Sequence, residues 1–203
     1  GFIKANQSKP FFVYLPHTMP HTRLGASSKF KGKSPRGLYG DVIEEIDHST
    51  GRILDALREL GLEKNTYVLF TSDNGPWLIK NKGKIDGALE GDHGGSAGVL
   101  RSGKVSTWEG GQRVPTVFWA PGRIRPNTTC KAMASTLDIL PTFAALAGAQ
   151  VPKDRDLDGE DIGHLLAGRF EEARADKVYH YYLRTTLQAV RQGKWKLHLP
   201  RPA

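Results

Sequence analysis

The stretch at residues 66–77, TYVLFTSDNGPW, carries the strongest evidence for the fold class. Its first half is short, apolar, and rich in β-branched and aromatic residues, which predicts a buried strand over residues 66–71. The second half contains Ser, Asp, Asn, Gly and Pro, which favour a turn. Asp73 and Asn74 therefore stand where a strand ends, and ligands of α/β sheets bind at the carboxyl ends of strands.

Two more apolar runs predict strands on either side of this stretch: FFVYL at residues 11–15 and PTVFW at residues 115–119. The loop after the first run is rich in Pro, Ser, Gly and Lys, and it is long enough to be functional rather than merely connective. The lead-in before that run is short and polar, so we expect the chain to be cut from a longer protein.

Two helices are predicted among these strands. The first runs from Ser34 or Leu38 to Leu60 and ends at Gly61, because apolar residues recur on one stripe: Val42, Ile46, Ile53, Leu57 and Leu60. The second spans residues 135–147, where Ser135 and Asp138 are spaced as a capping box, and Gly148 would end it. This order of elements predicts an α/β fold, with part of a mixed, largely parallel sheet flanked by helices.

The tail from Lys177 differs from the rest, because it alternates and is rich in aromatic and β-branched residues. It predicts two or three short antiparallel strands, with a turn at Gln192-Gly193. We therefore expect residues 1–160 to belong to the α/β domain. Residues 161–203 would begin a small C-terminal antiparallel α+β subdomain.

Composition limits the partners of the 203-residue chain, whose net charge is +8 and whose isoelectric point is near 9.6. This charge has two readings, a solubilising surface or attraction to an anionic substrate or polymer. The basic residues are scattered without a nucleic-acid motif, so we expect no nucleic-acid partner. The apolar runs are far shorter than the roughly 20 residues of a membrane span. A single cysteine, Cys130, excludes an internal disulfide and a multi-cysteine zinc site.

Several polar residues are candidates for chemistry. Asp73 and Asn74 offer the hard oxygen ligands that Ca²⁺ or Mg²⁺ prefers, although DNGP is also a good turn by itself. His17 and His21 lie four residues apart in the loop after the first predicted strand, where prolines argue against a helix. Each is either a surface histidine or a group that binds an anionic oxygen or donates a proton to a leaving group.

Lys104 belongs to GKVSTWEGGQRVP, in which Gly103 and the pair Gly110-Gly111 indicate close backbone packing. A fixed ammonium at the mouth of a sheet suits an oxyanion, and the alternative is a solvated surface lysine. We interpret four further residues as loop polarity or capping groups: Asp86, Asp92, His93 and Asp138.

These segments, taken in order, resemble the C-terminal portion of type I sulfatases, the arylsulfatase-like members of the alkaline phosphatase superfamily. The resemblance covers nearly the whole chain. Its motifs are PFFVYLPHTMPH, LYGDVIEEID, FTSDNGP, GSAGVLRSGK, TWEGGQRVP, STLDILPTFAALAG and LDGEDIGHLL.

The resemblance implies a sulfuric ester hydrolase and gives each matching residue a role. Asp73 and Asn74 would hold calcium, with magnesium the less favoured ion. Lys104 would touch the sulfate and the formylglycine hydrate. His21 would contact the sulfate near the bridging oxygen, and His17 is a second substrate-binding candidate.

In the family, the formylglycine nucleophile comes from a cysteine in a Cys-x-Pro-Ser-Arg motif. Cys130 is followed by KAMAS, and the chain therefore lacks that motif. The resemblance thus implies that the chain by itself is inactive. Two smaller departures are Thr22-Arg23 after His21, and Val105-Ser106 where Gly-Thr is usual after the lysine. The second bears on how Lys104 is presented.

Two other functions stay open beside the sulfatase. One is a phosphate or phosphonate ester hydrolase of the same superfamily, and the other is a non-catalytic binder of sulfated polysaccharide. The expected partner is a sulfated small molecule or polysaccharide, and the resemblance implies a periplasmic, extracellular or lysosomal location. The sequence does not indicate an oligomeric state.

Overall fold

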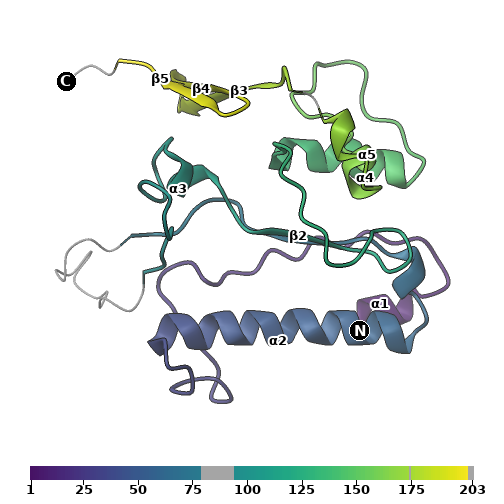
Figure 1. Ribbon diagram of the computed structural model, residues 1–203. Helices are drawn as coiled ribbons and strands as arrows, with labels where there is room; N and C mark the ends of the chain where they lie inside the picture. The colour runs from purple at the N-terminus through teal and green to yellow at the C-terminus, as the bar shows by residue number, and fades with distance from the viewer. Residues whose placement is uncertain (79–93, 174, 201–203) are drawn as a thin grey trace. The chain divides into compact units, whose positions relative to one another are not determined.

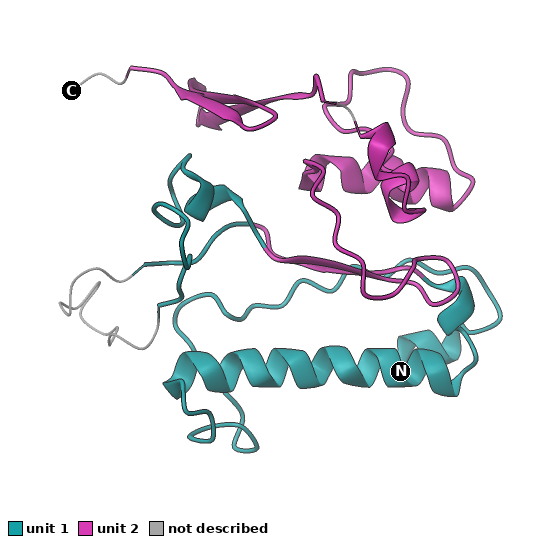
Figure 2. Ribbon diagram, viewed as in Figure 1, with its two compact units in different colours: residues 1–66, 74–114 teal, residues 67–73, 115–203 magenta. Residues whose placement is uncertain are grey.

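The computed structural model describes residues 1–78, 94–173 and 175–200 (Figure 1). The chain forms two compact units, one of residues 1–66 and 74–114 and the other of residues 67–73 and 115–203 (Figure 2). In the part of the chain that is described, no helix is long and apolar enough to cross a membrane.

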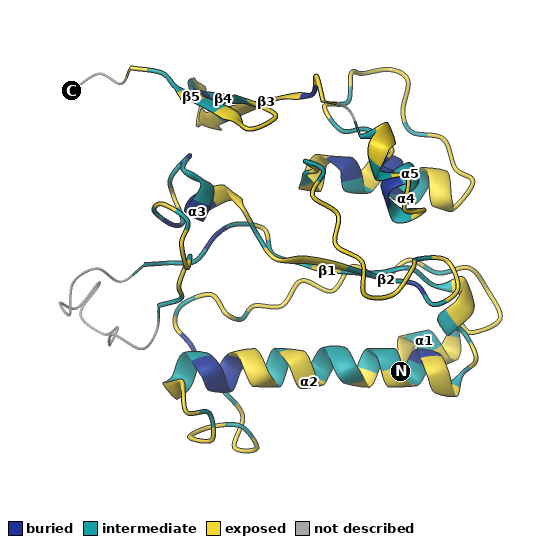
Figure 3. Cartoon of the chain, viewed as in Figure 1, coloured by how far each residue is buried: buried dark blue, intermediate teal, exposed yellow. Residues whose placement is uncertain are grey.

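The long helix of the first unit is α2 (Gly37–Glu59), which confirms the predicted helix. The helix has dark blue, buried positions in Figure 3. Val42 and Leu57 are each 1% exposed. The helix ends as predicted at Gly61, where φ is +67°. The Gly61 amide donates to the Arg58 carbonyl (3.0 Å) and the Leu62 amide to the Leu57 carbonyl (2.8 Å), which is the Schellman arrangement.

The start of α2 is held by a residue that the sequence analysis did not single out. Asp41 is 2% exposed, and its carboxylate accepts hydrogen bonds from the amides of Ser34 (2.7 Å), Gly32 (2.7 Å) and Lys33 (3.0 Å). These backbone donors stabilise the ionised form and hold the pKa of Asp41 below its usual value. The helix begins at Gly37 with Arg36 as its N-cap, between the two expected starts at Ser34 and Leu38. Asp41 thus fastens the preceding loop to the helix.

Among its described residues, the first unit also contains three short helical segments: α1 (Phe2–Ala5), η1 (Glu63–Asn65) and α3 (Glu109–Gln112). The strand predicted at residues 11–15 is wrong for this structure, because the segment has no strand assignment and four of its residues are exposed. Phe12 is 69% exposed and Tyr14 is 78% exposed. A strand needs a neighbour for its backbone hydrogen bonds, and no described segment pairs with this one as a strand.

The second unit begins with β1 (Val68–Thr71) and β2 (Thr116–Trp119), which confirm two predicted strands. They pair antiparallel, with Leu69 opposite Phe118. Helices and sheets together confirm the α/β class, but all strand pairs among the described residues are antiparallel, so the largely parallel part of the expected sheet stays a prediction.

The helical part of this unit contains η4 (Thr136–Asp138), α4 (Ile139–Leu146), α5 (Gly163–Leu166) and η5 (Phe170–Glu172). The predicted capping box is present. The Ser135 hydroxyl accepts from the Leu137 amide (3.2 Å), while the Asp138 carboxylate accepts from the Ser135 amide (2.7 Å). Gly148 ends α4 with a φ of +69°, as its position predicted.

The predicted C-terminal strands are confirmed as a three-stranded antiparallel sheet in the order β3-β4-β5. These strands are β3 (Val178–Leu183), β4 (Thr186–Gln192) and β5 (Trp195–His198). Gly193 has a φ of +53° in the turn between β4 and β5. The proposed domain boundary at residue 160 stays a prediction.

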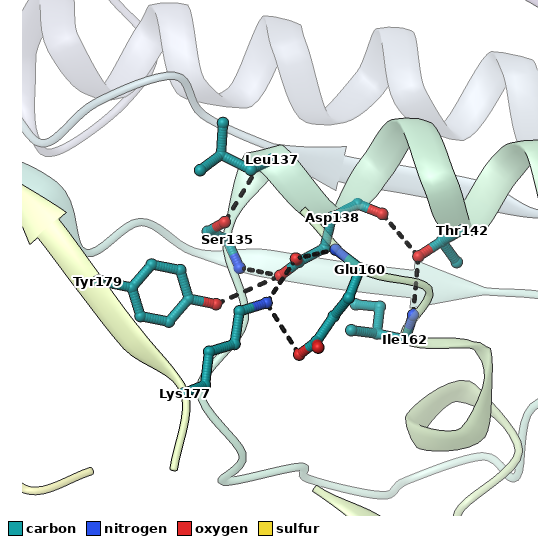
Figure 4. Close-up of polar contacts among 8 residues, drawn as sticks. All are labelled: Ser135, Leu137, Asp138, Thr142, Glu160, Ile162, Lys177 and Tyr179. Carbon is teal, nitrogen blue, oxygen red and sulfur yellow. Dashed lines mark hydrogen bonds and ion pairs between the residues drawn. The ribbon is translucent and has the colours of Figure 1, made fainter. Parts of the chain in front are cut away.

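A buried ion pair joins this tail to the helices (Figure 4). Asp138 is fully buried, and one of its carboxylate oxygens accepts from the Lys177 ammonium (2.7 Å) and from the Glu160 amide (3.0 Å). Lys177, which is 8% exposed, also pairs with the Glu160 carboxylate at 2.9 Å. The residue just before β3 is thereby fixed to the start of α4.

The ammonium of Lys177 stays charged in this setting. Burial by itself lowers its pKa, but the hydrogen bonds to Asp138 and Glu160 more than offset that effect and raise the pKa above its usual value. Removal of Lys177 would leave the buried Asp138 carboxylate without its counter-ion.

We predict that Lys177→Met lowers the free energy of unfolding by about 3 kcal/mol, since it leaves the buried Asp138 carboxylate without its counter-ion. Lys131→Met is the matched control, because Lys131 is an exposed lysine of the same unit. It should change stability by less than about 0.5 kcal/mol. Chemical denaturation of both variants measures the difference, and equal midpoints would show that the buried pair contributes nothing.

Candidate functional site

The turn after β1 carries the predicted metal ligands. Asp73 is exposed, and the next residue, Asn74, is half-buried. Gly75 is buried, and its amide donates to the carbonyl of Gly111 at 3.0 Å. The turn is therefore fastened at Gly75 to the segment that contains the predicted lysine.

Three backbone segments approach one another closely at this point. A Cβ added at Gly75 would collide with the carbonyl oxygen of Gly110, and one added at Gly110 would collide with the carbonyl oxygen of Ser102. A Cβ at Gly103 would come within 2.6 Å of the Pro76 carbonyl oxygen. The close packing that the glycines indicated is thus confirmed, and glycine is required because no side chain fits.

This packing places the backbone of Lys104 beside the turn. The Lys104 amide donates to the Pro76 carbonyl at 2.8 Å, two residues after Asn74. The Ser106 hydroxyl donates to the Gly103 carbonyl at 2.8 Å and closes the loop around the lysine. Lys104 itself is half-buried. The structure therefore brings together two of the predicted site segments, at Asn74 and at Lys104.

A second cation lies in the same segment. The Arg101 guanidinium stacks on the ring of Trp108 at 3.8 Å, and the Arg101 carbonyl accepts from the Gly110 amide at 2.9 Å. This stack links the two ends of the loop that carries Lys104. The sequence indicates Trp108 only as part of GKVSTWEGGQRVP. A stack between an arginine and a tryptophan seven residues apart leaves no periodic pattern in the sequence.

The two histidines follow the segment at residues 11–15, and both are exposed. The Nδ1 of His21 lies 2.7 Å from the Thr22 carbonyl oxygen. A carbonyl only accepts, so Nδ1 carries the hydrogen and Nε2 is the atom through which the ring would exchange a proton. His17 lines a half-open hollow of about 340 Å³ beside Val42 and Glu45 of α2. The convergence of His21 with Lys104 stays a prediction.

Asp73 and Asn74 fit calcium in the kind of ligand but not in number. Their side-chain oxygens are the hard donors that calcium takes, and calcium prefers roughly 6–8 of them. Within residues 1–78, 94–173 and 175–200, no group of three or more His, Cys, Asp or Glu side chains is placed to hold a metal. The remaining ligands must come from elsewhere. Asp86, Asp92 and His93 lie outside the described residues.

Comparison with known proteins identifies the family of the chain. Residues 1–149 match the sulfatase family, and residues 103–197 match the family described as N-sulphoglucosamine sulphohydrolase, C-terminal. The chain is 42% identical to mouse N-acetylgalactosamine-6-sulfatase. The match covers 98% of this chain and 36% of that protein. It is 41% identical to human steryl-sulfatase, with 89% of the chain matched to 30% of that protein.

Solved structures show the same likeness. One, from work on the metabolism of multiple glycosaminoglycans by Bacteroides thetaiotaomicron, has a TM-score of 0.81 and 31% identity. The match covers 100% of this chain and 41% of the chain in that structure. The PsFucS1 sulfatase from Pseudoalteromonas sp. has a TM-score of 0.77 and 29% identity, over 88% of this chain and 34% of that one.

The fold is of the α/β class, with the backbone of the Lys104 loop packed on the turn after β1. The family match is more specific, and the chain belongs to the sulfatase family. It spans about a third of the length of the curated relatives named above, 36% and 30%.

We predict that Gly75→Ala lowers the free energy of unfolding by about 1–3 kcal/mol, because the new methyl collides with the Gly110 carbonyl and the backbone must shift. Gly51→Ala is the control, since an added Cβ in α2 meets nothing within 4 Å there. It should be neutral or stabilise by up to about 1 kcal/mol. Thermal or chemical unfolding compares the two, and an undisturbed Gly75 variant would contradict the close approach.

Proposed function

We propose that the protein containing this chain hydrolyses a sulfate ester. The observation that carries the proposal is the hydrogen bond that ties the Lys104 amide to Pro76, beside Asn74, in a chain of the sulfatase family. Lys104 and Asn74 then lie on neighbouring backbone segments of the first unit. That combination suits an anion with several equivalent oxygens.

The chemistry explains why these residue types are needed. Hydrolysis brings a nucleophile and a sulfate ester together, and both carry negative charge. Lys104 would bind the sulfate through its ammonium, and fixed positive charge at that point lowers the energy of the transition state. Asp73 and Asn74 would supply two ligands to a calcium ion.

Formylglycine, whose motif this chain lacks, would provide the nucleophile. A bound calcium ion would neutralise charge on the sulfate. His21 would donate a proton to the leaving oxygen through Nε2, since Nδ1 is held by the Thr22 carbonyl. His17 would contact the substrate from the same loop.

The substrate would be a sulfated small molecule or a sulfated sugar. The names of the relatives support this class, because they include an N-acetylgalactosamine-6-sulfatase and a steryl-sulfatase. The net charge of +8 is consistent with an anionic substrate. We further propose that the protein is exported to the periplasm, the lysosome or the exterior.

We predict that Lys104→Ala in the full-length protein reduces kcat on 4-nitrophenyl sulfate by roughly 100-fold or more, as does removal of one oxyanion-stabilising donor. Lys31→Ala, which removes the same charge from an exposed position of the same unit, should leave kcat unchanged. Faster turnover of 4-nitrophenyl phosphate would favour the phosphate ester hydrolase. Sulfate-polymer binding without any turnover would favour the non-catalytic binder.

We predict that Asp73→Ala raises the calcium Kd of the full-length protein at least about 10-fold, the loss that follows removal of even an outer-shell partner. Activity should fall with it and return at higher calcium. Asp47→Ala, at an exposed acidic residue of α2, is the control. Calorimetry and a calcium titration of activity measure both, and full activity in the presence of chelator would refute the ligand role.

A further inference from the structure

The loop that carries Lys104 contains two residues in an unusual backbone conformation. Ser102 has a φ of +66° and Val105 has a φ of +70°, so both residues that flank Gly103-Lys104 are left-handed. Valine is the more informative of the two, because a β-branched residue with positive φ is a genuine outlier. Val105 is 70% exposed, and burial of its side chain therefore does not compensate for the conformation.

Contacts on both sides of Val105 impose this conformation. Before it, the Lys104 amide is held by the Pro76 carbonyl at 2.8 Å. After it, the Ser106 hydroxyl donates to the Gly103 carbonyl at 2.8 Å. The Gln112 side-chain amide donates to the Ser106 carbonyl, also at 2.8 Å. The chain must therefore reverse within one residue of the lysine. A strained residue persists where its surroundings over-determine it.

The packing of Gly111 removes the alternative paths for the loop. A Cβ at Gly111 would lie 2.5 Å from the Gly103 carbonyl oxygen and 2.8 Å from the Ser106 hydroxyl oxygen. The turn at residues 103–106 therefore rests directly on the backbone of α3. It has no room to relax toward an extended conformation without moving that helix.

We propose that Val105 is a positioning residue, whose left-handed backbone sets the direction in which Lys104 is presented. The inference rests on the proposed role of Lys104 and deepens it. The φ angle matters here rather than the valine side chain, which is exposed. A residue that accepts φ near +70° should therefore preserve the site, and one that forbids it should not.

Two substitutions at the same position separate these requirements. Glycine accepts the left-handed region without steric cost, whereas proline fixes φ near −65°. In the full-length protein, Val105→Gly should keep kcat on 4-nitrophenyl sulfate within about threefold of the wild type and should not lower the unfolding temperature. Val105→Pro should lower kcat by at least about 30-fold.

A general loss of structure is distinguished by two measurements. The calcium Kd of Val105→Pro should stay within about twofold of the wild type, because the turn after β1 is also held independently of Val105, by the Gly75 amide on the Gly111 carbonyl. In a Lys104→Ala background, Val105→Pro should cause no further loss of kcat, because its effect passes through the lysine. An additive loss, a collapsed calcium affinity or a fully active proline variant would each overturn the inference.

The same assays distinguish this inference from the proposed function. If Lys104→Ala retains full sulfate hydrolysis, the role of the lysine is wrong and the inference falls with it. If Lys104→Ala is impaired while Val105→Pro is fully active, only the positioning role is overturned. Equal impairment of Val105→Gly and Val105→Pro would show that the side chain, not the backbone angle, matters, and would also overturn it.

Discussion

The site depends on the close approach of three backbone segments around Gly75, Gly103 and Gly110. No side chain fits at these positions, since a Cβ would meet a carbonyl oxygen of a neighbouring segment at each of them. The location of the Lys104 backbone next to the turn after β1 is therefore a consequence of main-chain packing, sealed by the hydrogen bond to Pro76. Such packing is rigid, because interiors at this density do not absorb added volume. This packing fixes the position of the Lys104 backbone, and the proposed anion-binding role of the lysine depends on that position.

The second unit is fastened by a different kind of interaction. Asp138, Glu160 and Lys177 join the start of α4 to the residue before β3 through charged hydrogen bonds in a buried place. Main-chain packing is disrupted by added side-chain volume, whereas a buried ion pair is disrupted by the loss of one of its charges. The two units should therefore fail under different substitutions. Asp138 combines this pairing with its capping role, because its carboxylate accepts from the Ser135 amide as well as from Lys177.

Local patterns predicted most of the elements, and long-range partners could not be predicted. The capping box at Ser135 and the terminal glycine at Gly61 are local signals, and both were correct. The pairing of Lys177 with Asp138 spans 39 residues and leaves no mark in either neighbourhood. The apolar run at residues 11–15 predicted burial, yet a strand exists only with a partner, and Tyr14 is exposed here. In the site, the glycines predicted the close packing. The convergence of His21 with Lys104 stays a prediction, because it depends on loop geometry that no spacing in the sequence reveals.

The position after Lys104 shows how a sequence can depart from a family pattern while its backbone follows a demanding path. Glycine is the usual residue there in the sulfatases that this chain resembles, and glycine takes positive φ without cost. Here a valine occupies the position and adopts a φ of +70°. The contacts of Gly103, Ser106 and Gln112 must then outweigh the preference of the valine for an ordinary conformation. The path of the main chain around Lys104 is thus set by the contacts of the neighbouring residues rather than by Val105, which makes the turn. The proposed binding role of the Lys104 ammonium would require such a fixed path.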